Sequence, residues 1–258
     1  MSNQKYTTQL SAGLGLKEET KSLFELFEHG MTVQLMHERA LNSGLFPNIT
    51  ARRLRNIIAE CFSPRYLREK EVANNVKALM PKLTSAELTQ LFYFYTAKAN
   101  PILADFVKQV YWQKYASGYS TLATDESKSF IEAALQAGKM QKIWSESTVK
   151  KVSSYLLGCL VDFSFLTVEN PKERRLTPPR LSDKLVVYLA YDLHFSGLGD
   201  NAVINHSYWQ LFGLAPEDVR EEIKNLALNR HWIIQAAGDV VQISWTYKSM
   251  EEVISVIA

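Results

Sequence analysis

The chain consists of short segments whose apolar residues recur at helical spacing and whose ends are marked by glycine or proline. Residues 17–29 precede Gly30, residues 31–42 precede Gly44, and residues 49–62 precede Pro64. Segments of this kind bury one face each, so they must pack against one another. The pattern predicts a mainly α fold, a helical bundle with a helix-turn-helix and small β-hairpins of the winged-helix type.

The third segment, 49–62, would be the second helix of the helix-turn-helix, with Asn48 as its N-cap. Its buried side would be formed by four residues at spacings of three and four: Leu54, Ile57, Ile58 and Cys61. At about 100° per residue, the opposite side carries Arg52, Arg55 and Asn56, with Arg53 on the flank. Arg65 and Arg68 follow just beyond Pro64.

Residues 51–70 therefore carry six basic and two acidic side chains. Guanidinium and amide groups on an exposed helix face are suited to phosphates and to base edges. The sequence predicts a nucleic-acid contact here; the alternative is the ordinary solvated face of a bundle helix.

Residues 84–117 are helical and rich in aromatic side chains, and Pro101 divides them into two helices. Aromatic residues can stack on bases. At helical spacing they more often pack between helices, and we expect that here.

Residues 125–180 follow the order of a winged helix. A helix over 125–137 is closed by Gly138, Ser145 caps a helix over 146–160, and a strand over 163–168 leads through a basic turn, 169–175, to a return strand that ends at the prolines 178–179. Lys150 and Lys151 would face outward from the helix. The wing and its flank would bring four basic groups to phosphate: Lys172, Arg174, Arg175 and Arg180. A surface hairpin with solubilising charge is the alternative.

Residues 181–258 repeat the winged-helix order. A helix ends at Gly197, a short helix covers 201–210, another runs from Pro216 to Asn229, two strands meet at Gly238-Asp239, and a last helix starts near Ser249. The exposed face of the helix from Pro216 mixes acidic and basic groups: Glu217, Arg220, Glu221 and Lys224. Because carboxylates repel phosphate, this module is expected to be structural or protein-binding.

The distribution of charge supports this difference between the modules. The whole chain has a net charge of only +2, but residues 1–180 hold 24 basic and 17 acidic side chains, whereas residues 181–258 hold 5 and 10. The predicted domains are a helix-turn-helix domain, 1–80, a helical core with a winged helix, 81–180, and a C-terminal winged-helix-like domain, 181–258.

Catalytic and metal-binding signatures do not occur in the sequence. The P-loop, GxGxxG, GxSxG and HExxH patterns are missing, and the five histidines have no metal-ligand spacing. Cys61 and Cys159 lie in apolar helical patterns, which fits a reducing compartment. The N-terminus has no signal-peptide character, and Asp162 interrupts the longest apolar run. We expect a cytoplasmic protein that is not an enzyme, has no cofactor or metal, and does not enter a membrane.

Two N-terminal runs, YTTQLSAGLGLKEETKSLFELFEHGMT and ALNSGLFPNITARRLRNIIAECF, resemble the BrxA family of bacterial BREX (bacteriophage exclusion) systems. The matching positions are Gly15, Glu18, Glu19, Leu23, Leu26, Gly30 and Ala51-Arg52-Arg53, and the run WIIQAAGDVVQISWTYKSMEEV is also similar to the family. The resemblance implies a small, mostly helical protein similar to the antitermination factor NusB, which acts in phage defence and binds double-stranded DNA through helix-turn-helix elements. That role would fall on Arg52, Arg53 and Arg55.

The sequence thus predicts a non-catalytic accessory protein that binds double-stranded DNA and other BREX subunits. Three alternatives remain open: a protein-interaction scaffold, an RNA-binding protein as the NusB resemblance suggests, and a transcriptional regulator. The last is the weakest, because no long heptad repeat offers a dimerisation helix.

Overall fold

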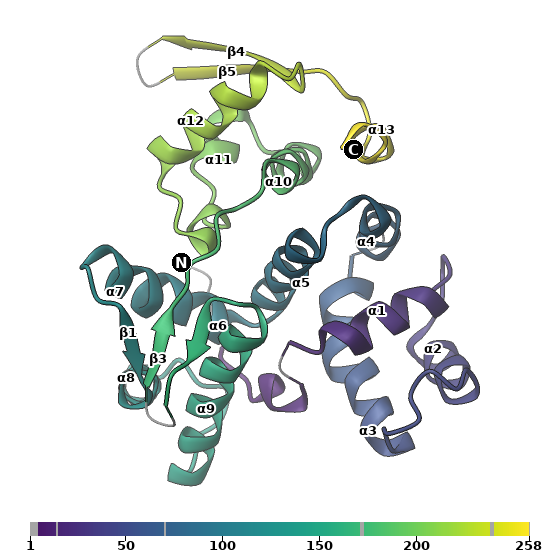
Figure 1. Cartoon of the computed structure of the whole chain (residues 1–258), viewed down its shortest axis with the longest axis vertical. Coiled ribbons are helices and arrows are strands. Elements are labelled where there is room, and N and C mark those ends of the chain that lie inside the picture. Colours follow the sequence, from purple (N-terminus) through teal and green to yellow (C-terminus); the bar gives the residue numbers. More distant parts are fainter. Residues whose placement is uncertain (1–4, 14, 70, 171–172, 238–239, 258) are drawn as a thin grey trace. The chain divides into compact units, whose positions relative to one another are not determined.

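The computed structural model describes residues 5–13, 15–69, 71–170, 173–237 and 240–257 (Figure 1). The chain divides into two compact units. Unit 1 comprises Met1–Asn74 and Phe92–Pro179, and unit 2 comprises Asn75–Leu91 and Arg180–Ala258. Two helices, α4 (Val72–Leu79) and α5 (Ser85–Ala99), therefore contribute residues to both units. The predicted division into three domains stays a prediction.

The N-terminal part of unit 1 consists of short helices. In order they are η1 (Gln9–Ala12), α1 (Lys17–Leu26), α2 (Val33–Asn42), α3 (Ala51–Asn56) and the π-helical segment η2 (Ile57–Leu67). Thr50 caps α3, since its hydroxyl accepts a hydrogen bond from the backbone N–H of Arg53 at 3.2 Å. The expected cap, Asn48, is wrong by two residues. Thr32 caps α2 in the same way, through the N–H of Leu35.

Pro64 does not end the third helix as predicted. The chain stays helical to Leu67 and takes π-helical geometry from Ile57 onward. In a regular α-helix the proline ring would clash with the carbonyl four residues earlier, and widened turns are a common way to relieve this strain. The buried residues of η2 consequently recur in pairs every four positions: Ile57 and Ile58, Cys61 and Phe62, Arg65 and Tyr66.

Most of the aromatic region of the chain is interior, as expected, but Tyr115 is exposed and Trp112 only partly buried. It forms α5, α6 (Pro101–Phe106), the π-helical segment η4 (Val107–Tyr111) and α7 (Trp112–Ala116), with the predicted break at Pro101. Phe92 and Tyr66 both pack around Phe24, whose ring centroid lies 6.2 and 4.9 Å from theirs. Tyr111 donates its hydroxyl to the carbonyl of Phe165 at 2.8 Å. These rings form the core of unit 1.

The remainder of unit 1 places a small sheet beside two helices (Figure 1). The helices are α8 (Thr124–Gln136) and α9 (Glu146–Asp162), and the strands are β1 (Thr121–Ala123), β2 (Leu166–Val168) and β3 (Glu173–Leu176), antiparallel in the order β1-β3-β2. The predicted strand over 163–168 is shorter, because Phe163 and Phe165 are buried and Ser164 has a positive φ of 65°. The strand β1 was not predicted from the sequence.

In unit 2, two strands that each contain one tryptophan pack against helices. Its elements after Arg180 are α10 (Asp183–Phe195), α11 (Asp200–Ile204), η5 (Trp209–Phe212), α12 (Pro216–Ala227), β4 (Trp232–Ala237), β5 (Val240–Trp245) and α13 (Met250–Val256). The short segment η3 (Met80–Lys82) precedes them in the chain. Asp200 accepts hydrogen bonds from the backbone N–H of Ile243 at 2.8 Å and from the indole of Trp245 at 3.0 Å. The predicted turn at Gly238-Asp239 lies outside the described residues.

In the described part of the chain the fold is mainly helical with small antiparallel sheets, which confirms the predicted mainly α class, whereas the helix-turn-helix and the winged helices stay predictions. Within the same residues, no helix is both long enough and apolar enough to cross a membrane.

Candidate nucleic-acid interface

The exposed side of α3 carries the predicted basic group. Leu54 is buried, whereas Arg52, Arg55 and Asn56 are exposed. In the part of the chain that the structure describes, these three side chains make no ion pair and no hydrogen bond. Two guanidinium groups and an amide are thus available to a ligand on one short helix.

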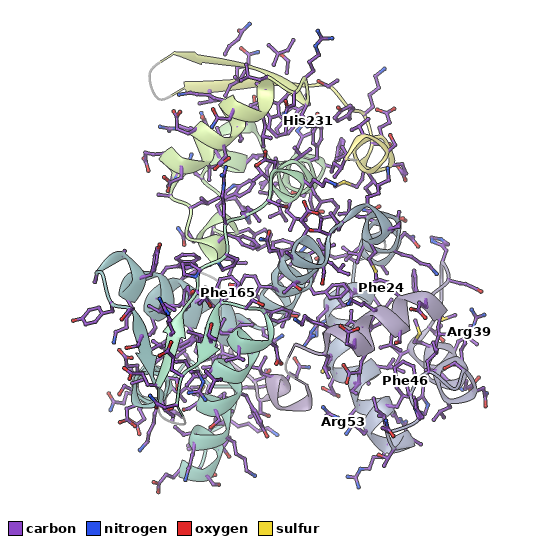
Figure 2. The ribbon with its side chains drawn as sticks, in the orientation of Figure 1. Phe24, Arg39, Phe46, Arg53, Phe165 and His231 are labelled. Carbon is purple, nitrogen blue, oxygen red and sulfur yellow. The ribbon has the colours of Figure 1, made fainter. Side chains whose placement is uncertain are left out.

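Arg53 is exposed on the same helix (Figure 2), and its side chain helps to line a pocket of mixed charge. The pocket has a volume of about 400 Å³ and is lined by Leu16, Lys17, Glu18, Glu19, Arg53 and Asp162. Three carboxylates against two cations make this hollow unfavourable for phosphate. Arg53 is therefore placed at the border between the basic face of α3 and an acidic hollow.

Arg65 lies in the interior, contrary to the expectation of an outward-facing arginine. It is only 6% exposed, and its guanidinium donates to the carbonyls of Gly13 at 3.2 Å and Gly15 at 3.4 Å. The four-residue recurrence of η2 turns this position toward the core, and we therefore leave Arg65 out of the candidate contacts. Arg68 follows η2 and is exposed, and among the described residues it makes no ion pair.

Lys150 and Lys151 lie in the first two turns of α9 and are both exposed. Ser145 caps the helix by accepting from the N–H of Thr148 at 3.3 Å. As for α3, the structure gives these two lysines no ion pair with any residue it describes. The positive end of the helix dipole lies beside them.

The predicted wing is instead the centre of a sheet. Arg174 and Arg175 lie on β3 between β1 and β2; Arg174 opposes Leu122 and Val168, and its guanidinium donates to Oγ1 of Thr124 at 3.3 Å. Arg175 is exposed and forms an ion pair with Glu169 at 3.8 Å. Lys172 lies outside the described residues.

Arg180 belongs to unit 2 rather than to the sheet of unit 1. Its side chain is 81% exposed, and its Nη2 lies 3.8 Å from Oε1 of Glu222 on α12. The exposed face of α12 is mixed as predicted, with Lys224 paired to Glu221 at 2.8 Å. The structure thus couples Arg180 to the acidic module.

A second pocket, missed by the sequence analysis, lies within unit 1. Its volume is about 500 Å³, and it is lined by Tyr6, Thr7, Thr8, Gln9, Glu60, Gln141, Lys142, Ile143, Trp144 and Thr148. Three separate stretches of chain contribute to it, so no local motif could have revealed it. The exposed Ile143, next to Trp144, was the one available signal.

The two thiols are unsuited to nucleophilic chemistry. Burial raises the pKa of the Cys159 thiol to about 12, and burial also raises the pKa of Cys61, against the opposing positive charges of Arg65 and Arg53. No group of three or more His, Cys, Asp or Glu side chains within the described residues is placed to hold a metal ion.

The model of a protein family described as BrxA matches residues 4–192. A crystal structure of an uncharacterized protein from Magnetospirillum magneticum is similar over 81% of this chain and 98% of that chain, with 15% sequence identity and a TM-score of 0.62. At that identity the likeness shows a shared fold. No curated protein sequence matches the chain.

Proposed function

Because the chain belongs to the BrxA family and so has a role in BREX phage defence, we propose that it is a non-catalytic accessory protein that binds double-stranded DNA. The observation that carries this proposal is the exposed basic face of α3. Arg52 and Arg55 stand there without ion pairs among the described residues, and Asn56 lies beside them. Unpaired surface cations can neutralise the phosphates of DNA and so release the counterions condensed on its backbone.

In this mechanism α3 acts as the second helix of a helix-turn-helix, with α2 preceding it. Its arginines contact phosphates or the edges of guanine, and the Asn56 amide suits the edge of adenine. Lys150 and Lys151 at the start of α9 supply further phosphate contacts. We propose the winged-helix interpretation of α8, α9 and the sheet on the same basis, with Arg175 rather than Arg174 as its exposed cation.

The acidic unit 2 has a different role in this proposal. Two of its cations, Arg180 and Lys224, are paired with the neighbouring carboxylates of Glu222 and Glu221. Such a surface repels DNA and is suited to docking other BREX subunits. If the chain binds no nucleic acid, it acts instead as a protein-interaction scaffold.

The decisive experiment measures the affinity of the full chain for duplex DNA, single-stranded DNA and RNA across a salt titration. Duplex DNA is expected to bind most tightly, and its affinity should fall steeply with salt. The variant R52E/R55E should abolish retention at moderate salt. Glu at position 52 suits the first turn of a helix, so α3 should persist.

The matched control is K224E/R230E, which changes two exposed basic residues of unit 2, Lys224 on α12 and Arg230 just after it. It makes the same change in charge and should retain wild-type affinity. Equal loss of affinity in both double variants would show only a dependence on net charge and would overturn the assignment to α3. Tighter binding of RNA than of duplex DNA would show that RNA is the ligand and would overturn the proposal of duplex DNA.

A further inference from the structure

The pocket bordered by Trp144 is an open hollow between three segments of unit 1. Two of the three segments that line it are hydrogen-bonded to each other, because the N–H of Tyr6 donates to the carbonyl of Lys139 at 2.8 Å and the N–H of Gln141 donates to the carbonyl of Tyr6 at 3.0 Å. Tyr6 is itself anchored by its hydroxyl, which donates to Asp105 at 2.5 Å. The pocket is therefore preorganised, and its volume of about 500 Å³ lies in the range of small-molecule sites.

The lining is polar and balanced in charge. It contains one cation, Lys142, one carboxylate, Glu60, and two side-chain amides, those of Gln9 and Gln141. Gln9 donates to Glu60 over a long 3.4 Å, and within the described residues the Gln141 amide has no hydrogen-bond partner. A net charge near zero disfavours a bare phosphate, whereas amides and a carboxylate match the mixed donors and acceptors of a neutral heterocycle.

Apolar surface is available at the same place. Trp144 is half-buried in the lining, and its indole offers a flat face. Ile143 beside it is 97% exposed, which leaves a large aliphatic side chain in water. Aromatic faces bind bases by stacking in a way that tolerates any sequence, and exposed aliphatic residues pack against unstacked bases.

We propose that this pocket binds a nucleobase, with Trp144 stacking on its face and Gln9, Gln141 and Glu60 pairing with its polar edge. The source of the base is inferred from the proposed function, on which this point rests: an unpaired base of a bound nucleic acid. A free nucleoside offers the same chemistry, and the experiment separates the two sources.

The position of the pocket along the chain supports a nucleic-acid source. Glu60 lies one helical turn after Asn56, the last residue of α3, and Thr148 lies one turn before Lys151 in α9. A lining residue thus lies within about one helical turn of each of the two exposed basic groups. A strand whose phosphates contact both groups would bring its bases to the pocket.

The test compares two labelled duplexes that differ by one bulged 2-aminopurine, a fluorescent base analogue. The full chain should bind the bulged duplex about tenfold more tightly than the paired one, and the fluorescence of 2-aminopurine should fall on stacking. The variant W144A should lose this preference and keep its affinity for the paired duplex. W144F retains an aromatic face and should keep most of the preference.

The outcomes separate this inference from the proposed function. Tight binding of both duplexes with no preference, or an unchanged preference in W144A, would overturn the nucleobase pocket and leave duplex binding intact. If neither duplex binds, adenosine and cytidine are titrated against tryptophan fluorescence. Quenching that W144F alters would support a pocket for free nucleosides, whereas no quenching by either nucleoside would overturn the pocket as well.

Discussion

The backbone N–H of Gly15 donates to Oδ2 of Asp162 over 2.9 Å, which joins the segment before α1 to the last residue of α9. A Cβ atom at position 15 would lie 2.6 Å from Cβ of Asp162, closer than two carbons can approach. Only glycine therefore allows this contact without a shift. Arg65 holds the same segment by donating to the carbonyls of Gly13 and Gly15.

We expect Gly15→Ala to destabilise the protein by about 1–3 kcal/mol, the usual cost of an added methyl group in a packed interior. The backbone of the segment before α1 would have to move away from α9 and lose the hydrogen bond to Asp162. Urea unfolding of the full chain measures this as a lower midpoint. An unchanged midpoint would contradict the close contact.

A second prediction separates the buried arginine from the exposed ones. Arg65→Met keeps an unbranched side chain of similar length but removes the donors to Gly13 and Gly15, so the free energy of unfolding should fall by about 1–3 kcal/mol. Under conditions in which the variant is folded, its affinity for duplex DNA should stay near that of the wild type. R52A/R55A should show the reverse: unchanged stability and a salt slope reduced by about two. If the folded Arg65→Met variant lost affinity for duplex DNA, Arg65 would have to contribute to the DNA interface after all.

Arg52 and Arg65 also mark where the α-helical period predicts burial correctly and where it fails. The α-helical period correctly predicted that Leu54 is buried and that Arg52, Arg55 and Asn56 are exposed. It failed after Pro64, because a proline normally signals the end of a helix and the continuation as a π-helix depends on tertiary packing. The recurrence of apolar residues at Ile58, Phe62 and Tyr66 was the available local signal.

The pocket at Trp144 and the strand β1 could not be predicted for a different reason. The residues of the pocket come from positions near 6, 60 and 144, and β1 pairs with β3 across about fifty residues. Periodicity and capping describe only neighbours in sequence. Long-range pairing is set by the packing of whole elements, so local patterns do not contain it.

A third prediction concerns the thiols. Cys61 and Cys159 are both buried, and burial raises the pKa of each, that of Cys159 to about 12. Because the thiolate is the reactive form, both should react slowly with Ellman's reagent at pH 8 in the native protein and rapidly in urea. Cys61 lies against Gly13, since a Cβ placed there would be 3.1 Å from its Sγ. Gly15→Ala should therefore speed the labelling of Cys61 more than that of Cys159.

The last prediction concerns pH and unit 2. Burial lowers the pKa of His194, with the charge of Asp200 opposing, and burial lowers the pKa of His231. Below the unfolded pKa of about 6.5, the unfolded chain binds protons that the folded chain resists, so stability should fall as the pH drops through that value. The ring of His194 stacks on Trp245 with centroids 4.3 Å apart, so tryptophan fluorescence reports the loss. In urea unfolding at pH 7.5 and 5.5, H194Q and H231Q should each reduce the difference in stability between the two pH values. If neither substitution changed the difference in stability between the two pH values, the pH dependence would have to come from carboxylates.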